Sequence, residues 1–238
     1  MLFRSDADIL VARPSRHGGG LHALISLRRA TRSAYRNLGS FFDYLLASQL
    51  LRIIAVALPM IFGNATLDTR HVLFCGFFMD LIALGLFASD KSLTTKRRRE
   101  AENISQYIKA QAPLWISALV GGLSILLLPR ILGWFGWFGP YHHKVEFSFV
   151  ALICSHLALF LMLRYDLVSQ PRKLLSDMRW IIYGVVVIAF LVLCFLVQPI
   201  GVLFDLEGQP IGFWLLSFVP PLLVILLYWV STPHKNKK

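Results

Sequence analysis

Charged residues, and acidic ones above all, are scarce in this sequence. Of its 238 residues 16% are charged, and 13 Asp and Glu stand against 24 Lys and Arg, a formal net charge of +11. With a hydrophobic fraction of 56% and a mean hydropathy of +0.63, so few charges exclude a soluble globular domain. The composition indicates a polytopic membrane protein.

Cysteine is also rare. The three cysteines, Cys75, Cys154 and Cys194, all fall inside apolar stretches. Small buried or lipid-facing side chains are the ordinary interpretation of such positions. We therefore expect neither a disulfide framework nor a metal site.

Long apolar runs are what the chain has in abundance. About 20 residues of helix are needed to cross roughly 30 Å of hydrocarbon. Six stretches are long enough: about 41–63, 71–89, 113–132, 146–166, 180–200 and 212–231. The expected fold is an all-α membrane protein, a six-transmembrane-helix bundle. The first three stretches do not resemble the last three, which argues against an unrelated six-span carrier built from internal repeats.

Basic residues predict the orientation, because cytoplasmic connections carry an excess of Lys and Arg. Twenty of them lie before the first span, between spans two and three or four and five, or after the last, against two, Arg70 and Lys144, in the opposite connections. Both termini and the connection 91–111 are expected to be cytoplasmic. The runs Lys96–Arg99 and Lys235–Lys238 are interpreted as anchors at that face; anionic lipid or nucleic acid is the alternative. The expected partner is the lipid bilayer, with no nucleic acid.

The segment 31–49 reads T-R-S-A-Y-R-N-L-G-S-F-F-D-Y-L-L-A-S-Q. It resembles the stalk and fifth membrane helix of P-type cation ATPases, whose usual wording is roughly G-R-x-x-Y-x-N-I-x-K-F-I-R-Y-L-L-S-S-N. Asp6–Val11 is likewise similar to the A-A-D-I-V-L that ends the phosphorylation domain of these pumps. The resemblance is most specific from Asp8 to Gln49.

By this resemblance the chain corresponds to membrane spans five to ten of a ten-span pump. It implies four parts: a remnant of a cytoplasmic phosphorylation domain at 1–20, a cytoplasmic stalk helix at 21–40, the six-helix transmembrane domain at 41–231 and a basic cytoplasmic tail at 232–238. The bacterial cytoplasmic membrane is the expected location.

Motifs that these pumps use to hydrolyse ATP are missing. The sequence contains no D-K-T-G, no T-G-D, no G-D-G-x-N-D and no P-E-G-L. The aspartyl phosphate and the nucleotide pocket lie in those segments. We therefore expect no ATPase activity from this chain alone and no catalytic residue or cofactor on it; ATP and Mg²⁺ would bind the missing domains, on a partner chain or in another part of a longer one.

Three ionisable groups, Arg52, Asp80 and His156, lie deep in the apolar stretches. Charges in the membrane are costly and usually face a bundle interior in pairs, so these groups are candidates for an ion pathway. Gln49 is a fourth candidate, because it stands where the family wording has Asn. His156 lies near a family glutamine that helps to form an ion site in some members; a helix-packing donor is the alternative.

The resemblance also bears on the ion. Arg52 stands where calcium pumps have a coordinating glutamate, and Phe74–Asp80 is similar to W-x-N-x-x-T-D with Gly76 and Met79 replacing Asn and Thr. Hard cations such as Ca²⁺ need six or more oxygen ligands, and Arg52, Gly76 and Met79 supply no side-chain oxygen. The changes argue against calcium and leave a proton or another monovalent cation.

Arg52 and Asp80 are expected to pair. At ~1.5 Å per residue they lie about 15 and 12 Å from the ends of spans joined by a short loop. Proton pumps of the plasma membrane also set an arginine of the fifth span against an aspartate of the sixth, which would make Asp80 the proton acceptor and Arg52 its counter-cation. A structural pair that only locks two helices is the alternative, as is a membrane scaffold or regulatory protein that kept the fold without activity.

The topology gives a first prediction. A cysteine introduced at Thr95 should be labelled by a membrane-impermeant thiol reagent only after the membrane is opened, because Thr95 belongs to the basic connection expected inside. Labelling from the outer side of intact cells would overturn the orientation.

Overall fold

The computed structural model describes residues 19–61, 67–88, 104–136, 141–164, 178–206 and 211–231. Apart from short turns and the extended Val197, the chain is helical in these ranges, as a hydrocarbon environment requires of backbone that must satisfy its own hydrogen bonds. Helices long and apolar enough to cross a membrane run over Asn37–Ile61, Thr69–Ala88, Tyr107–Trp134, Lys144–Leu163 and Trp214–Ser231. The all-helical class is thus confirmed, and five helices are candidates for membrane spans by their length and composition.

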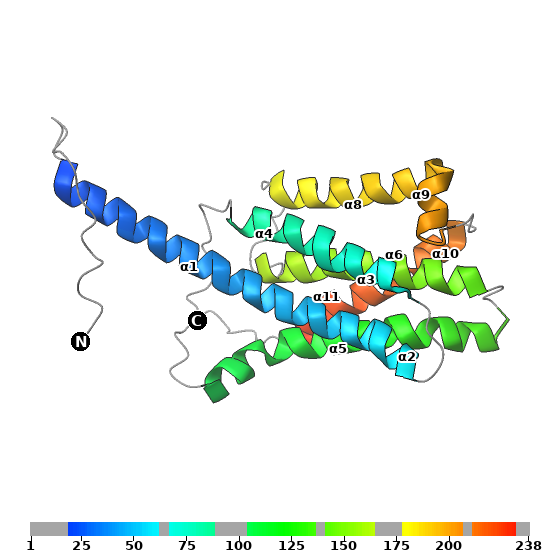
Figure 1. The fold of residues 1–238 in the computed structure, drawn as a ribbon. Coiled ribbons are helices and arrows are strands. Elements are labelled where there is room, and N and C mark those ends of the chain that lie inside the picture. The colour runs from blue at the N-terminus through cyan, green and yellow to red at the C-terminus, as the bar shows by residue number, and fades with distance from the viewer. Residues whose placement is uncertain are drawn as a thin grey trace.

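The fifth expected span, 180–200, is not one uninterrupted helix. Helix α8 covers Met178–Leu196 and its apolar part, Ile181–Cys194, is shorter than the other spans. Val197 is extended, with φ −104° and ψ 92°, and α9 (Gln198–Leu203) then begins with Pro199 in its first turn and runs steeply across the direction of α8 (Figure 1). Proline is tolerated in a first turn but cannot continue a preceding helix. The count of six spans stays a prediction.

The first span is the end of a much longer helix. Helix α1 runs over Gly19–Arg52, 34 residues, and continues through the π-helix η1 (Ile53–Ala57) into α2 (Leu58–Ile61). No break separates 21–40 from the apolar part, and the N-terminal half projects well beyond the other helices (Figure 1). Its role as a stalk stays a prediction. The expected phosphorylation-domain remnant falls mostly, and the basic tail wholly, outside the described residues.

The remaining helices complete the bundle. The second span consists of α3 (Thr69–Leu73), the π-helix η2 (Phe74–Met79) and α4 (Asp80–Ala88). Helix α5 covers Ile104–Trp134. It begins before the apolar stretch, in polar residues that hydropathy does not mark as a span, so the connection expected over 91–111 is shorter than predicted. Last come α6 (Tyr141–Arg164), α10 (Ile211–Leu216) and α11 (Val219–Ser231).

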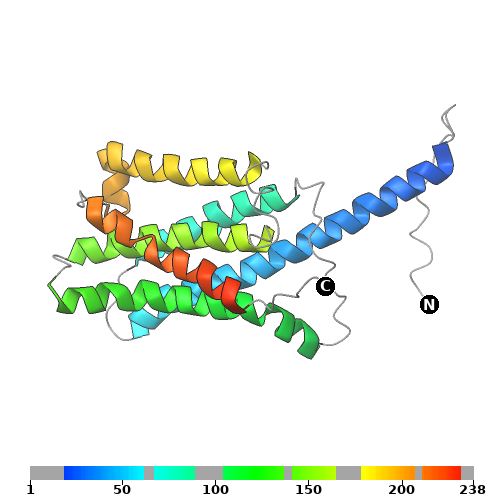
Figure 2. The same ribbon diagram turned by 180° about the vertical axis from the view of Figure 1, so that it is seen from behind.

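Helix α6 lies at the centre of the bundle. Its apolar span is 89% buried, and Phe147, Phe149 and Phe160 on it are completely buried. Helices α1, α5, α8 and α11 all pack against it. In Figure 2, which views the bundle from behind, α11 crosses in front of α5 and α6. The three cysteines are free and buried in this core, as expected for small apolar side chains.

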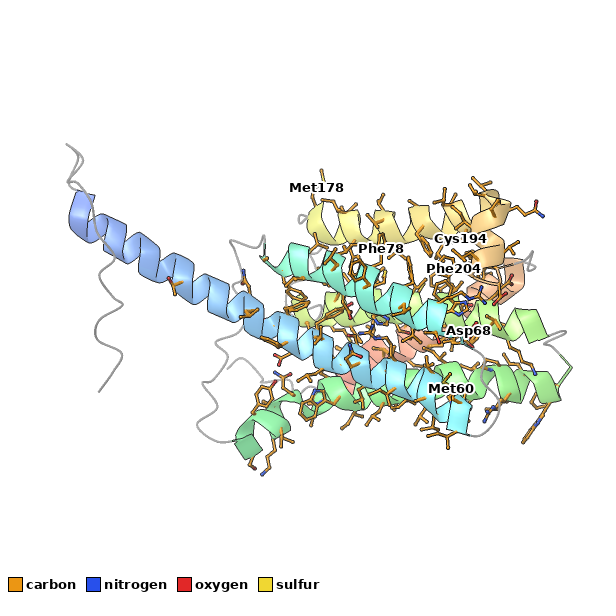
Figure 3. The ribbon with its side chains drawn as sticks, in the orientation of Figure 1. Met60, Asp68, Phe78, Met178, Cys194 and Phe204 are labelled. Atoms are coloured by element: carbon orange, nitrogen blue, oxygen red, sulfur yellow. The ribbon has the colours of Figure 1, made fainter. Side chains whose placement is uncertain are left out.

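Polar contacts at one end of the bundle join the second span to α9. Arg70 donates hydrogen bonds from Nη1 to the Leu203 carbonyl (2.7 Å) and from Nη2 to Asp68 (3.0 Å) and Asp205 (3.2 Å). The bond from Arg70 lowers the pKa of the exposed Asp68 carboxyl below its usual value. Figure 3 labels Asp68 at this end, close to Phe204.

His71 completes this junction. Its Nδ1 accepts the Asp68 backbone N–H at 3.0 Å, so Nε2 carries the proton and donates to the Phe204 carbonyl at 3.0 Å. The imidazole also packs edge-on against Phe149 of α6, with ring centroids 4.6 Å apart. This end of the second span is therefore fixed by directional contacts to both α9 and α6.

Close approach of the first span to α5 depends on Gly122. A Cβ at this position would lie 2.9 Å from Ile54 Cβ and 3.0 Å from the Leu51 carbonyl oxygen. Real Cβ contacts are longer than this, and backbone atoms cannot move aside independently. Gly122 thus sets how closely α5 packs against the segment of the first span that ends in Arg52.

Gly122→Ala should lower the thermal stability of the purified protein by the equivalent of about 1 to 3 kcal/mol, the usual cost of overpacking. Gly184→Ala on α8 is the control, because nothing lies within 4 Å of a Cβ there. Thermal unfolding in detergent measures both. Equal effects of the two substitutions would contradict the close approach.

Candidate ion-pathway site

One face of α1 carries three polar side chains at helical spacing. Tyr44, Ser48 and Arg52 are four residues apart, and their exposed fractions are 0%, 0% and 4%. Residues four apart lie above one another on a helix. The face points into the bundle, where α1 packs against α4 and α6.

Arg52 forms a buried ion pair with Asp80. Its Nη2 lies 2.5 Å from Asp80 Oδ2, and the two side chains are only 4% and 7% exposed. Ser48 Oγ donates to Asp80 Oδ1 at 3.5 Å, and Arg52 Nε donates to the Ser48 carbonyl at 3.4 Å. The structure therefore brings together the two residues that the sequence predicted to pair, and adds a serine that joins both.

Both partners stand where α-helix changes to π-helix. Arg52 is the last residue of α1, directly before η1, and Asp80 is the first residue of α4, directly after η2. Pro59 explains the first π segment, because its ring clashes with the carbonyl four residues earlier and a wider turn relieves the clash. π segments are rare and occur frequently at functional sites.

A tyrosine pair covers the ion pair on one side. Tyr44 Oη and Tyr183 Oη of α8 are 3.3 Å apart, and Tyr183 Oη donates to the Met79 carbonyl at 3.4 Å. Both rings pack against Phe160 of α6. Hydroxyl and carbonyl groups thus continue from the ion pair toward α8. The i, i+4 spacing of Tyr44 from Ser48 was a signal for this role; nothing local in the sequence distinguishes Tyr183.

His156 lies in α6 with no exposed surface. Its Nδ1 is 2.8 Å from the Leu152 carbonyl, to which it donates, and its Nε2 has no hydrogen-bond partner among the described residues. The Nδ1 side of the His156 imidazole therefore acts as the helix-packing donor considered in the sequence analysis. The other nitrogen is a buried acceptor, and a role for it in an ion pathway stays a prediction.

Gln49 is not brought to the ion pair. Its side chain is exposed on α1, whereas its neighbour Ser48 is completely buried. A part for Gln49 in the pathway stays a prediction. Among the described residues, no group of three or more His, Cys, Asp or Glu side chains could hold a metal ion.

A second buried carboxylate was missed by the sequence analysis. Asp43 is 4% exposed and accepts hydrogen bonds from Tyr107 Oη (2.6 Å) and Gln111 Nε2 (3.0 Å) at the start of α5. The acid lies near the start of the first apolar stretch, which begins at about residue 41. It ties α1 to α5 two to three turns before Arg52.

Comparison with known proteins identifies the family of this chain. The family described as "Cation transporting ATPase, C-terminus" matches residues 64–232, which include Asp80, His156 and Tyr183. The chain belongs to this family, and it contains the C-terminal transmembrane region of a P-type cation ATPase. No curated protein and no solved structure matches the chain. Arg52 precedes the matched range and is joined to it by the contacts of α1 with α4, α5 and α6.

A double-mutant cycle tests the ion pair. Arg52→Ala and Asp80→Ala should each destabilise the protein by about 3 to 5 kcal/mol, because each leaves an uncompensated buried charge, whereas the double variant should lose much less than the sum. Thermal unfolding in detergent is the measurement.

The exposed pair Arg70–Asp205, with side chains 43% and 35% exposed, provides the control cycle. Its coupling should not exceed about 1 kcal/mol. Additive losses at Arg52 and Asp80 would refute the buried pair.

Proposed function

We propose that this chain is the ion-translocating part of a P-type ATPase that moves a proton or another monovalent cation. The single observation that carries the proposal is the buried pair of Arg52 and Asp80. A carboxylate buried among helices of a cation-transporting ATPase is the natural acceptor for the ion, and the guanidinium beside it distinguishes this acceptor from a metal site.

The charge balance favours a proton over calcium. A divalent ion at Asp80 would need six or more oxygens, but the groups that contact this carboxylate are the hydroxyls of Ser48 and Tyr44 and the Arg52 cation. A second cation beside the guanidinium would be repelled in a medium of low dielectric constant. A proton needs only one carboxylate oxygen.

In the proposed cycle, Arg52 moves away from Asp80 Oδ2 and a proton binds to that oxygen. When the guanidinium returns, the proton is released to the other side and the ion pair forms again, so that Asp80 cannot be protonated from outside. The π segments next to both residues are the places where a helix can change its register at small cost. Gln49 and the buried His156 nitrogen are proposed as further groups of the same pathway.

ATP hydrolysis would be supplied elsewhere. We place the phosphorylated aspartate, the nucleotide and Mg²⁺ in domains carried by a partner chain or by another part of a longer protein, because the motifs for them are not in this sequence. The assembly would lie in the bacterial cytoplasmic membrane with both termini of this chain in the cytoplasm, where those domains would need to be.

A membrane scaffold or regulatory protein without transport is the second candidate. The ion pair and Ser48 satisfy one another, and such a set is sufficient to lock α1 against α4 without any ion. The two functions differ in one respect: only transport requires the pair to open.

The assembly itself provides the test. We expect the tagged chain, purified from its native membrane, to bring with it a polypeptide containing D-K-T-G, and the complex to show vanadate-sensitive ATPase activity that the isolated chain lacks. In proteoliposomes the complex should acidify one compartment when ATP is added.

The variant Arg52→Gln/Asp80→Asn should abolish this proton movement, whereas Arg70→Ala/Asp205→Ala, at the far end of the second span, should leave it intact. Vanadate-sensitive ATP hydrolysis by the isolated chain would contradict the proposal that the ATP-hydrolysing domains lie elsewhere. Unchanged transport in the first variant would refute the role of the ion pair in the pathway, and a complex that moves no cation would favour the scaffold.

A further inference from the structure

Gly76 lies directly beside the Arg52 guanidinium. It is in η2, four residues before Asp80. A Cβ at this position would lie 2.5 Å from Arg52 Nη1 and 3.7 Å from Arg52 Cζ. Outside the helix that carries Gly76, no other described heavy atom would lie within 4 Å of it. The space that a side chain would fill at residue 76 is therefore occupied by the guanidinium itself.

An arginine head group usually yields to a new methyl group at little cost, because it ends a flexible side chain. Here the head group is held from several directions: Nη2 contacts Asp80 Oδ2 and lies 3.5 Å from Ser48 Oγ, and Nε bonds the Ser48 carbonyl. It is also 96% shielded from solvent. Any movement away from residue 76 changes these contacts inside a low-dielectric environment, where an unpaired charge is expensive.

We propose that Gly76 is the positioning residue that admits the Arg52 guanidinium to the site opposite Asp80. A side chain at residue 76 displaces the guanidinium from the carboxylate, and Asp80 is then left to bind an exchangeable proton. Residue 76 thus decides whether the carboxylate is neutralised by a resident cation or by one taken from solution. The inference concerns the folded chain and holds for a pump and a scaffold alike.

The first experiment compares Gly76→Ala with Gly85→Ala in the wild type and in the background Arg52→Ala/Asp80→Ala. Gly85 is on the same span, and a Cβ there meets nothing within 4 Å. Gly76→Ala should lower the melting temperature in the wild type. In the double-variant background it should leave the melting temperature unchanged or raise it, because alanine is the better helix former once the guanidinium is gone.

Gly85→Ala should have the same small effect in both backgrounds. If Gly76→Ala alone does not fold, folding of the triple variant supports the proposal, and failure of the triple variant overturns it. An equal effect of Gly76→Ala in both backgrounds also overturns it, because residue 76 would then act through packing unrelated to Arg52.

The second readout is the infrared band of a protonated carboxylic acid, which a purely structural role would not change. At neutral pH it should be present in Gly76→Ala, absent in the wild type and in Gly85→Ala, and lost again in Gly76→Ala/Asp80→Asn. Destabilised Gly76→Ala protein without this band would refute the displacement of Arg52. In the part of the chain that the structure describes, the titratable and charged groups that interact with Asp80 or with its partner Arg52 are Tyr44, Tyr183, Cys75, His156 and Arg52 itself. None of them is a second carboxyl.

Discussion

The ion pair between Arg52 and Asp80 constrains the rest of the bundle. Each charge alone costs about 2.5 to 3.5 kcal/mol at the centre of a membrane on insertion scales, so the first and second spans must meet where the two residues stand. Ser48 bonds to both partners, and Gly76 leaves room for the guanidinium. The contacts that surround the pair are thus consequences of keeping it intact.

The two parts of the second span are held by different kinds of contact. At the far end of the second span, Arg70 and His71 bind the backbone of α9 through hydrogen bonds. Around the ion pair itself both spans instead change to π-helix, and the hydroxyls of Tyr44 and Tyr183 make longer contacts of 3.3 and 3.4 Å. A second span fixed at one end and irregular beside its charge suits a carboxylate whose partner moves during a cycle.

The sequence predicted most of the fold because apolar length and lipid leave few solutions. It predicted the Arg52–Asp80 pair because opposite charges at similar depth on adjacent helices are expected to face each other inside the bundle. It missed Tyr183 and Asp43, whose roles depend on packing between helices distant in the chain. Pro199 is a sequence signal for the interruption at Val197, but the start of α5 at Ile104 was not visible, since hydropathy does not register a helix that extends beyond the apolar run. In the sequence, Gly76 was interpreted as the loss of an oxygen ligand. The structure shows that the space beside Gly76 is occupied by the Arg52 guanidinium.

The most direct test of the central claim is solid-state nuclear magnetic resonance on the chain reconstituted in lipid bilayers, with the Asp80 carboxyl carbon assigned by comparison with Asp80→Asn. The account predicts the chemical shift of an ionised carboxylate and a dipolar contact between this carbon and the guanidinium nitrogens of Arg52. A neutral carboxylic acid at Asp80 without that contact would contradict it.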